Sequence, residues 1–335
     1  MHPKIIHDHL YASSLLQAGK LVSFPTETVY GLGADARDLA AIAKVFSLKQ
    51  RPLNHPLIVH IADINLLPNV ACNIPTYAYL LAQNFWPGAL TLVLKKSAAI
   101  DEMITGGQGT VAVRIPAHDL TRELLKGFPL GIVGPSANKF GKISPTCALH
   151  VIDDLGDEED FTAVLDGGTC TVGIESTIID CSRTQPSILR HGQISRQAIE
   201  EILGATLHSA APDVRISGNL KSHYAPQATT LLGSYAEIIK FISKFKHKKI
   251  GVLSFINNPH NFNGSWLMEQ NTAKVYAQHL YNNLRTLDKE LPDYILIEKA
   301  PENMLWQGIN DRLKKAASKA NLSELLALDK TFVHA

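Results

Sequence analysis

Five cationic side chains of this chain stand beside predicted strand ends or in polar loops, namely Lys49, Arg51, Arg114, Lys142 and Arg190. Lysine and arginine hold phosphate and carboxylate groups through charge-assisted hydrogen bonds. These five cations occupy similar positions although the net charge of the whole chain is only +1. We therefore predict a cavity for a small molecule with several negative charges, with a nucleoside triphosphate as the leading candidate.

Local chemistry leaves more than one interpretation of these cations. Lys49 and Arg51 follow a helical pattern and precede Pro52. Because the helix dipole favours cations in the last turn, a solvated C-terminal cap explains them as well as an anion site does. Arg114 lies in an apolar strand pattern. A buried guanidinium needs a partner, which is either an internal carboxylate or an anionic ligand, and the strand does not decide between them.

Two loops rich in hydroxyl groups and glycine follow predicted strands. Residues 24–36 contain Thr28, and residues 133–146 contain Ser136, Asn138 and Ser144. Ligands of α/β sheets usually bind at strand carboxyl ends, and serine, asparagine and backbone amides suit a phosphate or a base. Tight turns with threonine caps would have the same composition. Further polar groups at strand ends are Ser176, Arg190 and His60, and a hydrogen-bonded core histidine is the simpler interpretation of His60.

The elements that would position these side chains alternate over the first two hundred residues. Apolar periodicity predicts helices over residues 9–18, 39–48, 75–85 and 146–155. Short β-branched or apolar runs predict strands over residues 21–24, 57–61, 89–94, 110–115, 131–133, 163–165 and 177–180. This alternation is typical of an α/β domain with a mixed sheet.

A second domain is predicted after a break in the periodicity. Residues 207–228 carry Pro212, Gly218 and Pro226 and are interpreted as a linker. Strands are then expected over residues 229–232, 250–255 and 294–298, with helices over 277–287 and 310–319. The predicted division is a catalytic domain over 1–206, a linker over 207–228 and a small doubly wound α/β domain over 229–335.

Composition narrows the class of protein. The chain has 335 residues, with 32 Lys and Arg against 31 Asp and Glu, which is not the basic excess of a dedicated nucleic-acid binder. The cysteines show no metal-binding spacing, so a metal site formed by the protein is not expected. P-loop, GxGxxG and GxSxG motifs are absent from the sequence. With no signal-peptide pattern and no long apolar run, we expect a cytoplasmic protein without membrane contact.

A series of ordered motifs gives a sharper expectation. PTETVYGLGADA, the pair Lys49 and Arg51, HPLIVHI, FWPGALTLVL, VAVRIP, GPSAN, LDGG, GIESTI and LRHG occur in the order found in YrdC-domain proteins, over roughly residues 8–205. The segment beginning at His223 and the extra domain resemble the longer, two-domain threonylcarbamoyl-AMP synthases. The resemblance implies a YrdC-like twisted mixed sheet with helices around a large cavity, and a small Rossmann-like C-terminal domain.

The resemblance also implies an activity and a role for each matching residue. L-Threonine, bicarbonate and ATP, the last with Mg²⁺, would give threonylcarbamoyl-AMP and pyrophosphate, and a tRNA threonylcarbamoyl transferase would use the product. Catalysis would depend on Lys49 and Arg51. ATP-binding positions would be Lys49, Arg51, His55, Thr110, Ser136, Asn138, Ser144, Arg190 and Tyr224. L-Threonine-binding positions would be Thr28, His60, Arg114, Gly134 and Ser176. The linker around Tyr224 would be a lid. A YrdC-type protein that binds tRNA or double-stranded RNA, or that regulates without synthase activity, is the alternative.

Overall fold

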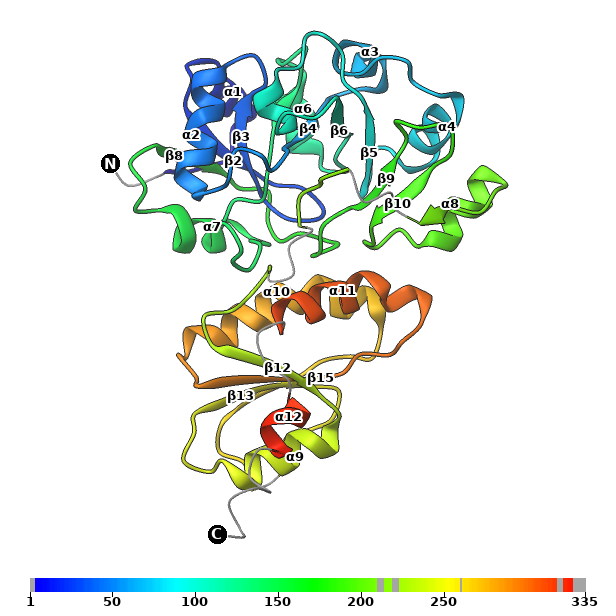
Figure 1. Ribbon diagram of the computed structural model, residues 1–335. Helices are drawn as coiled ribbons and strands as arrows, with labels where there is room; N and C mark the ends of the chain where they lie inside the picture. Colours follow the sequence, from blue (N-terminus) through cyan, green and yellow to red (C-terminus); the bar gives the residue numbers. More distant parts are fainter. Residues whose placement is uncertain (1–3, 210–213, 219–222, 260, 318–321, 328–335) are drawn as a thin grey trace. The chain divides into compact units, whose positions relative to one another are not determined.

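The computed structural model describes residues 4–209, 214–218, 223–259, 261–317 and 322–327, drawn in colour in Figure 1. The chain divides into two compact units. The first consists of Met1–Phe140 and Ser144–Asn219, and the second consists of Gly141–Ile143 and Leu220–Ala335. None of the helices in the described ranges combines the length and the apolar character that a membrane span requires.

A mixed sheet of 11 strands forms the frame of the first unit, in the order β1-β8-β2-β3-β7-β4-β6-β5-β9-β10-β11. Its strands are β1 (Lys4–Ile6), β2 (Leu21–Phe24), β3 (Gly31–Asp35), β4 (Ile58–His60), β5 (Leu90–Lys95), β6 (Thr110–Arg114), β7 (Ile132–Val133), β8 (Phe161–Leu165), β9 (Thr177–Asp180), β10 (Ser187–Arg190) and β11 (His208–Ser209). The sheet contains parallel pairs such as β4–β6 and antiparallel pairs such as β5–β6. The predicted mixed α/β sheet is confirmed.

Helices pack against this sheet and deliver residues to its edges. They are α1 (His9–Gln17), α2 (Leu39–Lys49), η1 (Ile64–Leu66), α3 (Leu67–Val70), α4 (Thr76–Phe85), α5 (Glu102–Thr105), α6 (Asp119–Leu125), α7 (Ala148–Leu155) and α8 (Arg196–Leu203). The Asp38 side chain caps α2 by accepting from Ala41 N, and Gln50 ends the helix in the left-handed region at φ 54°. This ending leaves Lys49 as the last helical residue.

The core of the first unit lies between the central strands and these helices. Leu32, Val59 and Leu92 come from the sheet, while Ile42 and Val45 come from α2, and all five are fully buried. Every residue of β2 and β3 is buried as well. Strands covered on both faces are near-continuous apolar runs, which is why the pattern of residues 21–24 was sufficient to predict β2.

Several segments that were not predicted as strands belong to the sheet, among them β1, which pairs with β8. Residues 31–35 were interpreted as part of a loop, but they form β3, which pairs antiparallel with β2 through Val22 and Gly33. A side chain at Gly33 would begin 2.8 Å from Val22 O, so glycine allows the strand to pack here although it has low strand propensity. Within the predicted linker, His208–Ser209 pairs with β10 as β11.

A four-stranded parallel sheet forms the second unit, in the order β12-β15-β13-β14. Its elements are β12 (Thr229–Gly233), α9 (Tyr235–Lys244), β13 (Ile250–Ser254), β14 (Ser265–Met268), α10 (Ala273–Lys289), β15 (Tyr294–Glu298), η2 (Met304–Trp306), α11 (Gln307–Ala316) and α12 (Leu322–Ala327). Figure 1 shows α10 and α11 on one face of this sheet, with α9 and α12 on the other. The predicted small doubly wound α/β fold is confirmed.

Candidate functional site

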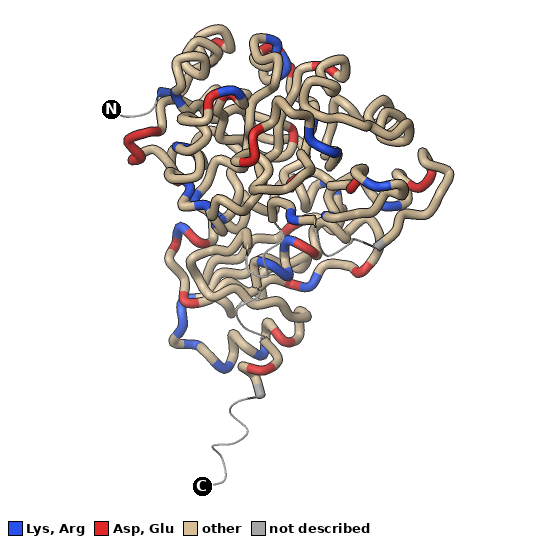
Figure 2. Tube along the Cα trace, turned by 45° about the horizontal axis from the view of Figure 1, so that its top comes forward, with Lys and Arg blue, Asp and Glu red and all other residues tan. Residues whose placement is uncertain are grey.

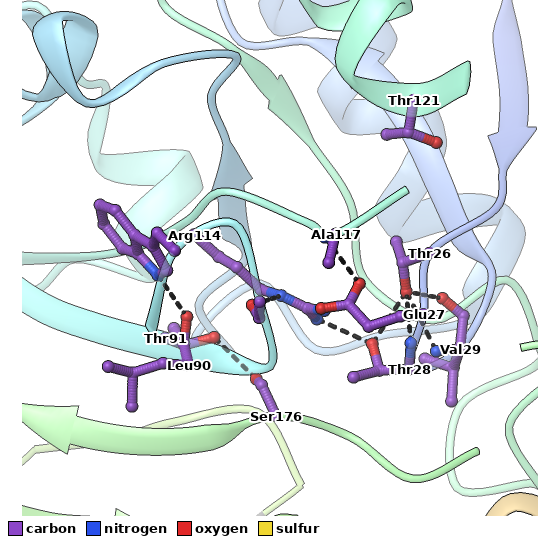
Figure 3. A network of polar contacts seen from close by, with 12 residues as sticks. Thr26, Glu27, Thr28, Val29, Leu90, Thr91, Arg114, Ala117, Thr121 and Ser176 are labelled. Atoms are coloured by element: carbon purple, nitrogen blue, oxygen red, sulfur yellow. Dashed lines mark hydrogen bonds and ion pairs between the residues drawn. The ribbon is translucent and has the colours of Figure 1, made fainter. Parts of the chain in front are cut away.

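Arg114, the last residue of β6, forms a buried ion pair with Glu27 of the loop after β2 (Figure 3). Its Nη2 lies 2.5 Å from Glu27 Oε1, and the two side chains are 4% and 6% exposed. Nη1 donates to Thr28 Oγ1 at 2.7 Å. The internal carboxylate that the sequence allowed is therefore present. Because a guanidinium has five N–H donors, it can bind a further anion beside Glu27. We call Glu27, Thr28 and Arg114 the Arg114 cluster.

The loop that carries Glu27 and Thr28 is fixed by the preceding threonine. Thr26 Oγ1 donates to Val29 O at 2.6 Å and accepts from the backbone N–H groups of Thr28 and Val29, each at 3.1 Å. The backbone N–H of Ala117 donates to Glu27 Oε2 at 3.0 Å. These contacts hold the carboxylate in one orientation, so the ion pair is part of an ordered network and not a chance surface contact.

The hydroxyl groups of Thr91 and Ser176 form a pair at the level of Arg114 in the sheet. Leu92 of β5 is opposite Val113 of β6, so that Thr91 is level with Arg114. Thr91 Oγ1 lies 2.7 Å from Ser176 Oγ, immediately before β9. Both residues are buried, and Figure 3 shows them together with the Arg114 cluster. Hydroxyl groups therefore line the sheet next to the ion pair.

Arg190, at the end of β10, connects this pair to a second arginine. Its Nε donates to Ser176 O at 3.0 Å, and its Nη2 donates to Ser176 Oγ at 3.1 Å. Its Nη1 donates to Ser217 O at 2.9 Å, while Nη2 of Arg51 donates to Ser217 Oγ at 3.0 Å. We call Arg51, Arg190 and Ser217 the Arg51 cluster. One serine of the predicted linker thus contacts both arginines.

Arg51 is also held by its neighbours along the chain. Its Nη2 donates to Pro56 O at 2.8 Å, and its guanidinium carbon lies 5.5 Å from the centre of the Phe140 ring. The His55 ring meets the same phenylalanine edge to face at 5.2 Å. Burial, with Arg51 as the next cause, lowers the pKa of His55 from its ordinary value. His55 is therefore neutral near pH 7, and the positive charge beside it belongs to Arg51.

Lys49 is almost completely buried and points at backbone oxygens of the loop after β7. Its Nζ donates to Ser136 O at 2.5 Å and to Asn138 O. Burial is the main cause that lowers the pKa of Lys49 well below its ordinary value, and Arg51 adds to it. An anion bound nearby would reverse part of this effect, so that anion binding and protonation of Lys49 support each other.

His60, at the end of β4, is a buried neutral base. Burial, with repulsion from Arg114 as the next cause, lowers the pKa of His60 to about 3. Its ring packs edge to face on Phe24, with centroids 5.3 Å apart. A Cβ at Gly134 would lie 3.0 Å from the ring and 2.5 Å from Phe24 Cζ, so only glycine fits beside it. His60 and Gly134, both predicted for the same subsite, are thus neighbours.

Three residues predicted for the ATP site are not members of either cluster. Ser144 is buried and donates to Glu175 Oε1 at 2.6 Å, next in the chain to Ser176. Thr110 begins β6, four residues before Arg114, and is therefore at the opposite end of that strand. Tyr224 belongs to the second unit, where its ring stacks on Tyr281 at 5.7 Å, so its role in nucleotide binding stays a prediction.

Four residues in or beside the clusters were missed by the sequence analysis: Glu27, Thr91, Phe140 and Ser217. Glu27 could have been found, because a buried arginine requires a carboxylate or a ligand, and the adjacent loop holds one. Ser217 lies in a stretch without periodicity, which offers no comparable signal. The clusters contain guanidinium groups, hydroxyls and the Glu27 carboxylate, and the neutral imidazole of His60 lies opposite Arg114 in the sheet. Burial raises the pKa of the nearby Cys170 thiol, with Glu27 as the next cause, which makes that thiol a poor nucleophile.

A metal site made of protein side chains is not evident. In the described part of the chain, no group of three or more His, Cys, Asp or Glu residues is placed to hold a metal ion. Glu27 is engaged by Arg114 and Ala117, and Glu175 is engaged by Ser144. The two acids of the site therefore already have partners within the protein.

Comparison with known proteins gives the family context. Residues 14–192 match the Sua5–YciO–YrdC family, described as telomere recombination. Residues 194–318 match the family described as the threonylcarbamoyl-AMP synthase C-terminal domain. Both matches lie in the order that the sequence analysis predicted.

Two threonylcarbamoyl-AMP synthases match this chain over most of their length, across both family matches. The chain is 38% identical to the threonylcarbamoyl-AMP synthase of Pyrococcus abyssi over 325 residues, covering 91% of this chain and 93% of the relative. It is 38% identical to that of Bacillus subtilis over 320 residues, covering 91% and 92%. The crystal structure of P. abyssi Sua5 complexed with L-threonine matches 93% of this chain and 95% of that chain, with a TM-score of 0.85 and 38% identity.

Proposed function

The chain belongs to the two-domain threonylcarbamoyl-AMP synthase family, and from this premise we propose that it joins L-threonine, bicarbonate and ATP to form threonylcarbamoyl-AMP and pyrophosphate. It is accordingly a nucleotidyltransferase. We propose further that the product serves threonylcarbamoyladenosine formation in tRNA and passes to a separate tRNA threonylcarbamoyl transferase.

One observation supports this proposal most strongly. Hydrogen bonds run from Arg51 through Ser217 to Arg190 and from there to Ser176. The Ser176 hydroxyl contacts that of Thr91, which is level with Arg114 in the sheet. A reaction between an amino acid and a nucleotide needs adjoining subsites, because proximity and orientation supply much of the rate. The link between the residues proposed for ATP and those proposed for threonine fits that need.

The Arg114 cluster suits a zwitterionic amino acid. The guanidinium can take the threonine carboxylate, and the buried Glu27 carboxylate supplies the opposite charge for an ammonium group. Thr28, Ser176, His60 and Gly134 complete the proposed threonine site. Because His60 stays neutral, it acts there as a hydrogen-bonding group and not as a charge.

The Arg51 cluster and its surroundings suit a triphosphate. Arg51 and Arg190 present guanidinium groups, and Lys49 adds a cation beneath the loop of Ser136 and Asn138. We propose that these residues, together with His55, Thr110 and Ser144, bind ATP. Loops with serine, asparagine and exposed backbone amides commonly bind phosphate.

The chemistry needs charge stabilisation more than covalent catalysis. The neutral amine of threonine takes up carbon dioxide from bicarbonate and loses a proton, which gives a carbamate. A carbamate oxygen then bonds to the α-phosphorus as the bond from that phosphorus to the pyrophosphate oxygen breaks. Lys49, Arg51 and Arg190 would stabilise the charge that develops on the phosphates. His60 is a weak base at a pKa of about 3, so the amine proton leaves by another route.

Mg²⁺ is proposed to arrive with ATP. It would be bound by phosphate oxygens and water, because the acids near the site already have protein partners. Its chemical contribution would be to neutralise part of the phosphate charge. The product is a mixed anhydride that water destroys, and the burial of Arg114, Ser176 and Lys49 limits access of water to the reacting groups.

Pyrophosphate release by the purified full chain tests the proposal. With ATP, Mg²⁺ and bicarbonate present, release should depend on added L-threonine and should be lost in Lys49→Ala. Equal release with and without threonine would indicate a nucleotide hydrolase or another acceptor. Absence of release despite ATP binding would favour a regulatory or RNA-binding protein.

A further inference from the structure

Three parallel strands of the second unit end in polar groups that the proposed function does not use. β13 ends at Ser254, β14 is followed directly by Glu269, and β15 ends at Glu298. Chain order reverses at this edge, because β15 returns to a position between β12 and β13. Ligands of open parallel sheets bind outside the carboxyl ends of the strands, where the order reverses. This edge is therefore the part of the small fold best placed to hold a ligand.

Ser254 contacts both of the glutamates at these strand ends. Its Oγ donates to Glu298 Oε2 at 2.6 Å, and the backbone N–H of Phe255 donates to the same oxygen at 2.9 Å. The backbone N–H of Glu269 donates to Ser254 O at 2.9 Å. We call Ser254, Glu269 and Glu298 the Ser254 cluster. Its two carboxylates come from different strands and are held in fixed positions beside one serine.

The negative charge of this cluster is not neutralised by a lysine or an arginine. Both signs of charge occur in the second unit, as the blue and red positions of Figure 2 show, and Asp311 there pairs with Arg312 and Lys315. Within the described ranges, neither Glu269 nor Glu298 has such a partner, although Glu269 is only 8% exposed. A partly buried carboxylate without a cation is costly, so a positively charged ligand would be stabilised here.

Histidine and asparagine side chains of α10 orient Glu269 without supplying a permanent charge. Glu269 Oε2 accepts from Asn283 Nδ2 at 2.9 Å and lies 3.0 Å from His279 Nδ1. The His279 side chain is 49% exposed and carries a charge only when it is protonated. The face of α10 that contains these two residues therefore lies against the cluster.

Tyr276 of the same helix has a buried hydroxyl group without a partner. The residue is 1% exposed, and in the described part of the chain its Oη forms no hydrogen bond. It precedes His279 by three positions and Asn283 by seven, so it belongs to the same helix face. Burial, followed by Glu269 and then Glu298, raises the pKa of Tyr276, which places its hydroxyl near both carboxylates. Because an unpaired buried hydroxyl costs stability, a ligand that bonds to it would recover that cost.

Apolar side chains flank the cluster along the chain. The Tyr276 ring packs against Phe255 and Trp306, with both centroid distances at 5.3 Å. Four exposed large apolar side chains belong to the same strand ends or to η2 directly after them, and they are Ile256, Met268, Met304 and Leu305. A ligand with an apolar portion could cover part of this surface.

We propose that the Ser254 cluster binds a small organic ammonium ion with an apolar body. The ammonium group would donate to the carboxylates of Glu298 and Glu269 and to Tyr276 Oη, since charge-assisted bonds of this kind are the strongest available to a carboxylate. The nearby aromatic rings add a favourable field for a cation. The apolar body would lie on the exposed side chains around the cluster.

Other ligand classes fit these groups less well. A nucleotide or another anion would be repelled by the two carboxylates. A sugar could bond to them through its hydroxyl groups but would leave their charge in place. A metal ion would lack ligands, because in the ranges that the structure describes no three His, Cys, Asp or Glu residues are placed to hold one. The proposal goes beyond the synthase activity, because none of the residues proposed for ATP or threonine belongs to this cluster.

Calorimetric titration of the full chain with 2-phenylethylamine, without ATP or threonine, tests the proposal. The neutral isostere 2-phenylethanol should bind at least about tenfold more weakly, because it cannot form the charge-assisted bonds. Glu298→Gln keeps an acceptor for Ser254 and Phe255 but removes the charge, and should weaken amine binding about tenfold. Absence of amine binding, or equal binding of amine and alcohol, would overturn the proposal.

Glu302→Gln is the matched control for the change in net charge. Glu302 is an exposed acid of the same edge, between β15 and η2, and its loss should change amine affinity less than about twofold. An equal loss in Glu298→Gln and Glu302→Gln would overturn the proposal, because it would show only a general effect of charge on this surface.

Tyr276→Phe separates a ligand site from a purely structural cluster. Because the hydroxyl has no partner within the described part of the protein, its removal should keep or raise the midpoint of urea unfolding. The same variant should weaken amine binding about fivefold, since it removes one acceptor from the ammonium group. Lower stability with unchanged amine affinity would overturn the proposal. None of these measurements uses ATP or threonine, so their outcome is independent of the proposed function.

Discussion

The Arg114 cluster and the Arg51 cluster hold their arginines in different ways. Arg114 is bound by a carboxylate, Glu27, at 2.5 Å. Arg51 and Arg190 are oriented by carbonyl and hydroxyl oxygens of Pro56, Ser176 and Ser217. A carboxylate both orients and neutralises a guanidinium, whereas a neutral oxygen orients it and leaves its charge in place.

This difference matches the charges of the two proposed substrates. A zwitterion such as threonine has one charge of each sign, and a paired cluster presents one charge of each sign to it. A triphosphate has only negative charge, and the Arg51 cluster brings two guanidinium groups together at Ser217. Two groups of residues in the first unit can thus distinguish an amino acid from a nucleotide by the charges that they bring together.

The largest expected effect concerns the buried ion pair. Glu27→Ala leaves the guanidinium of Arg114 buried without its carboxylate and should lower the free energy of unfolding by about 3–5 kcal/mol. Urea denaturation followed by circular dichroism measures this. The control is Glu123→Ala, which removes an exposed carboxylate beside Lys126 and should leave the stability essentially unchanged. A small loss in Glu27→Ala would mean that the carboxylate does not define the Arg114 cluster.

Next in size is the effect of the buried lysine on turnover. Lys49→Met keeps the length of the side chain but removes its charge and its bonds to Ser136 O and Asn138 O. The rate of pyrophosphate release should fall about 100- to 1,000-fold, the usual cost of one electrostatic stabiliser of a transition state. L-Threonine binding, measured by calorimetry, should change little. Loss of both substrates to the same degree would contradict a division between the two clusters.

A smaller effect is the pH dependence that His60 imposes. Its pKa falls from 6.5 to about 3 on folding. Below pH 6.5, His60 therefore binds a proton in the unfolded state but stays neutral in the folded state until the pH nears 3. The contribution of neutral His60 to the free energy of unfolding is therefore complete above about pH 6.5 and is lost as the pH falls toward 3. Between pH 6 and 5 the slope should approach about 1.4 kcal/mol per pH unit. His60→Gln should reduce that slope in urea titrations, and an unchanged slope would contradict a buried neutral imidazole.

The smallest effect is expected at the serine between the two arginines. Ser217→Ala removes the hydroxyl that Arg51 contacts but keeps the carbonyl that Arg190 contacts. Affinity for ATP should fall about fivefold, as expected for loss of about 1 kcal/mol from one hydrogen bond. Calorimetric titration with ATP measures this, with Ser97→Ala as the control, since Ser97 is a half-buried serine distant in sequence that donates to Asn69 O. A loss of threonine affinity instead would place Ser217 with the Arg114 cluster.

Sequence patterns predicted strands that are largely buried on both faces and rich in apolar residues. The strands over 21–24, 177–180 and 294–298 have the predicted limits, because both faces of each are largely buried. The strand over 31–35 was missed, because its glycines have low strand propensity and its pairing with β2 is a tertiary effect. Chain order alone could not reveal that Ser217 reaches Arg51, which is 166 residues away.

The site was predicted better in its cations than in their partners. Lys49, Arg51, Arg114 and Arg190 stood out because cations recur beside strand ends and in polar loops of a chain whose net charge is only +1. Glu27, by contrast, was missed because the loop that contains it was interpreted from its hydroxyl groups and not from its carboxylate. The pairing of Arg114 with Glu27, and not the presence of Arg114, distinguishes the two clusters, and only the folded arrangement reveals it.

The most direct test of this account is the fate of labelled bicarbonate. The full chain is incubated with ATP, Mg²⁺, L-threonine and ¹³C-bicarbonate, and the nucleotide products are analysed at once by mass spectrometry. The account predicts an AMP adduct whose mass corresponds to threonine plus one labelled carbonyl, formed with pyrophosphate and absent without threonine. AMP and pyrophosphate without a labelled, threonine-dependent adduct would contradict it.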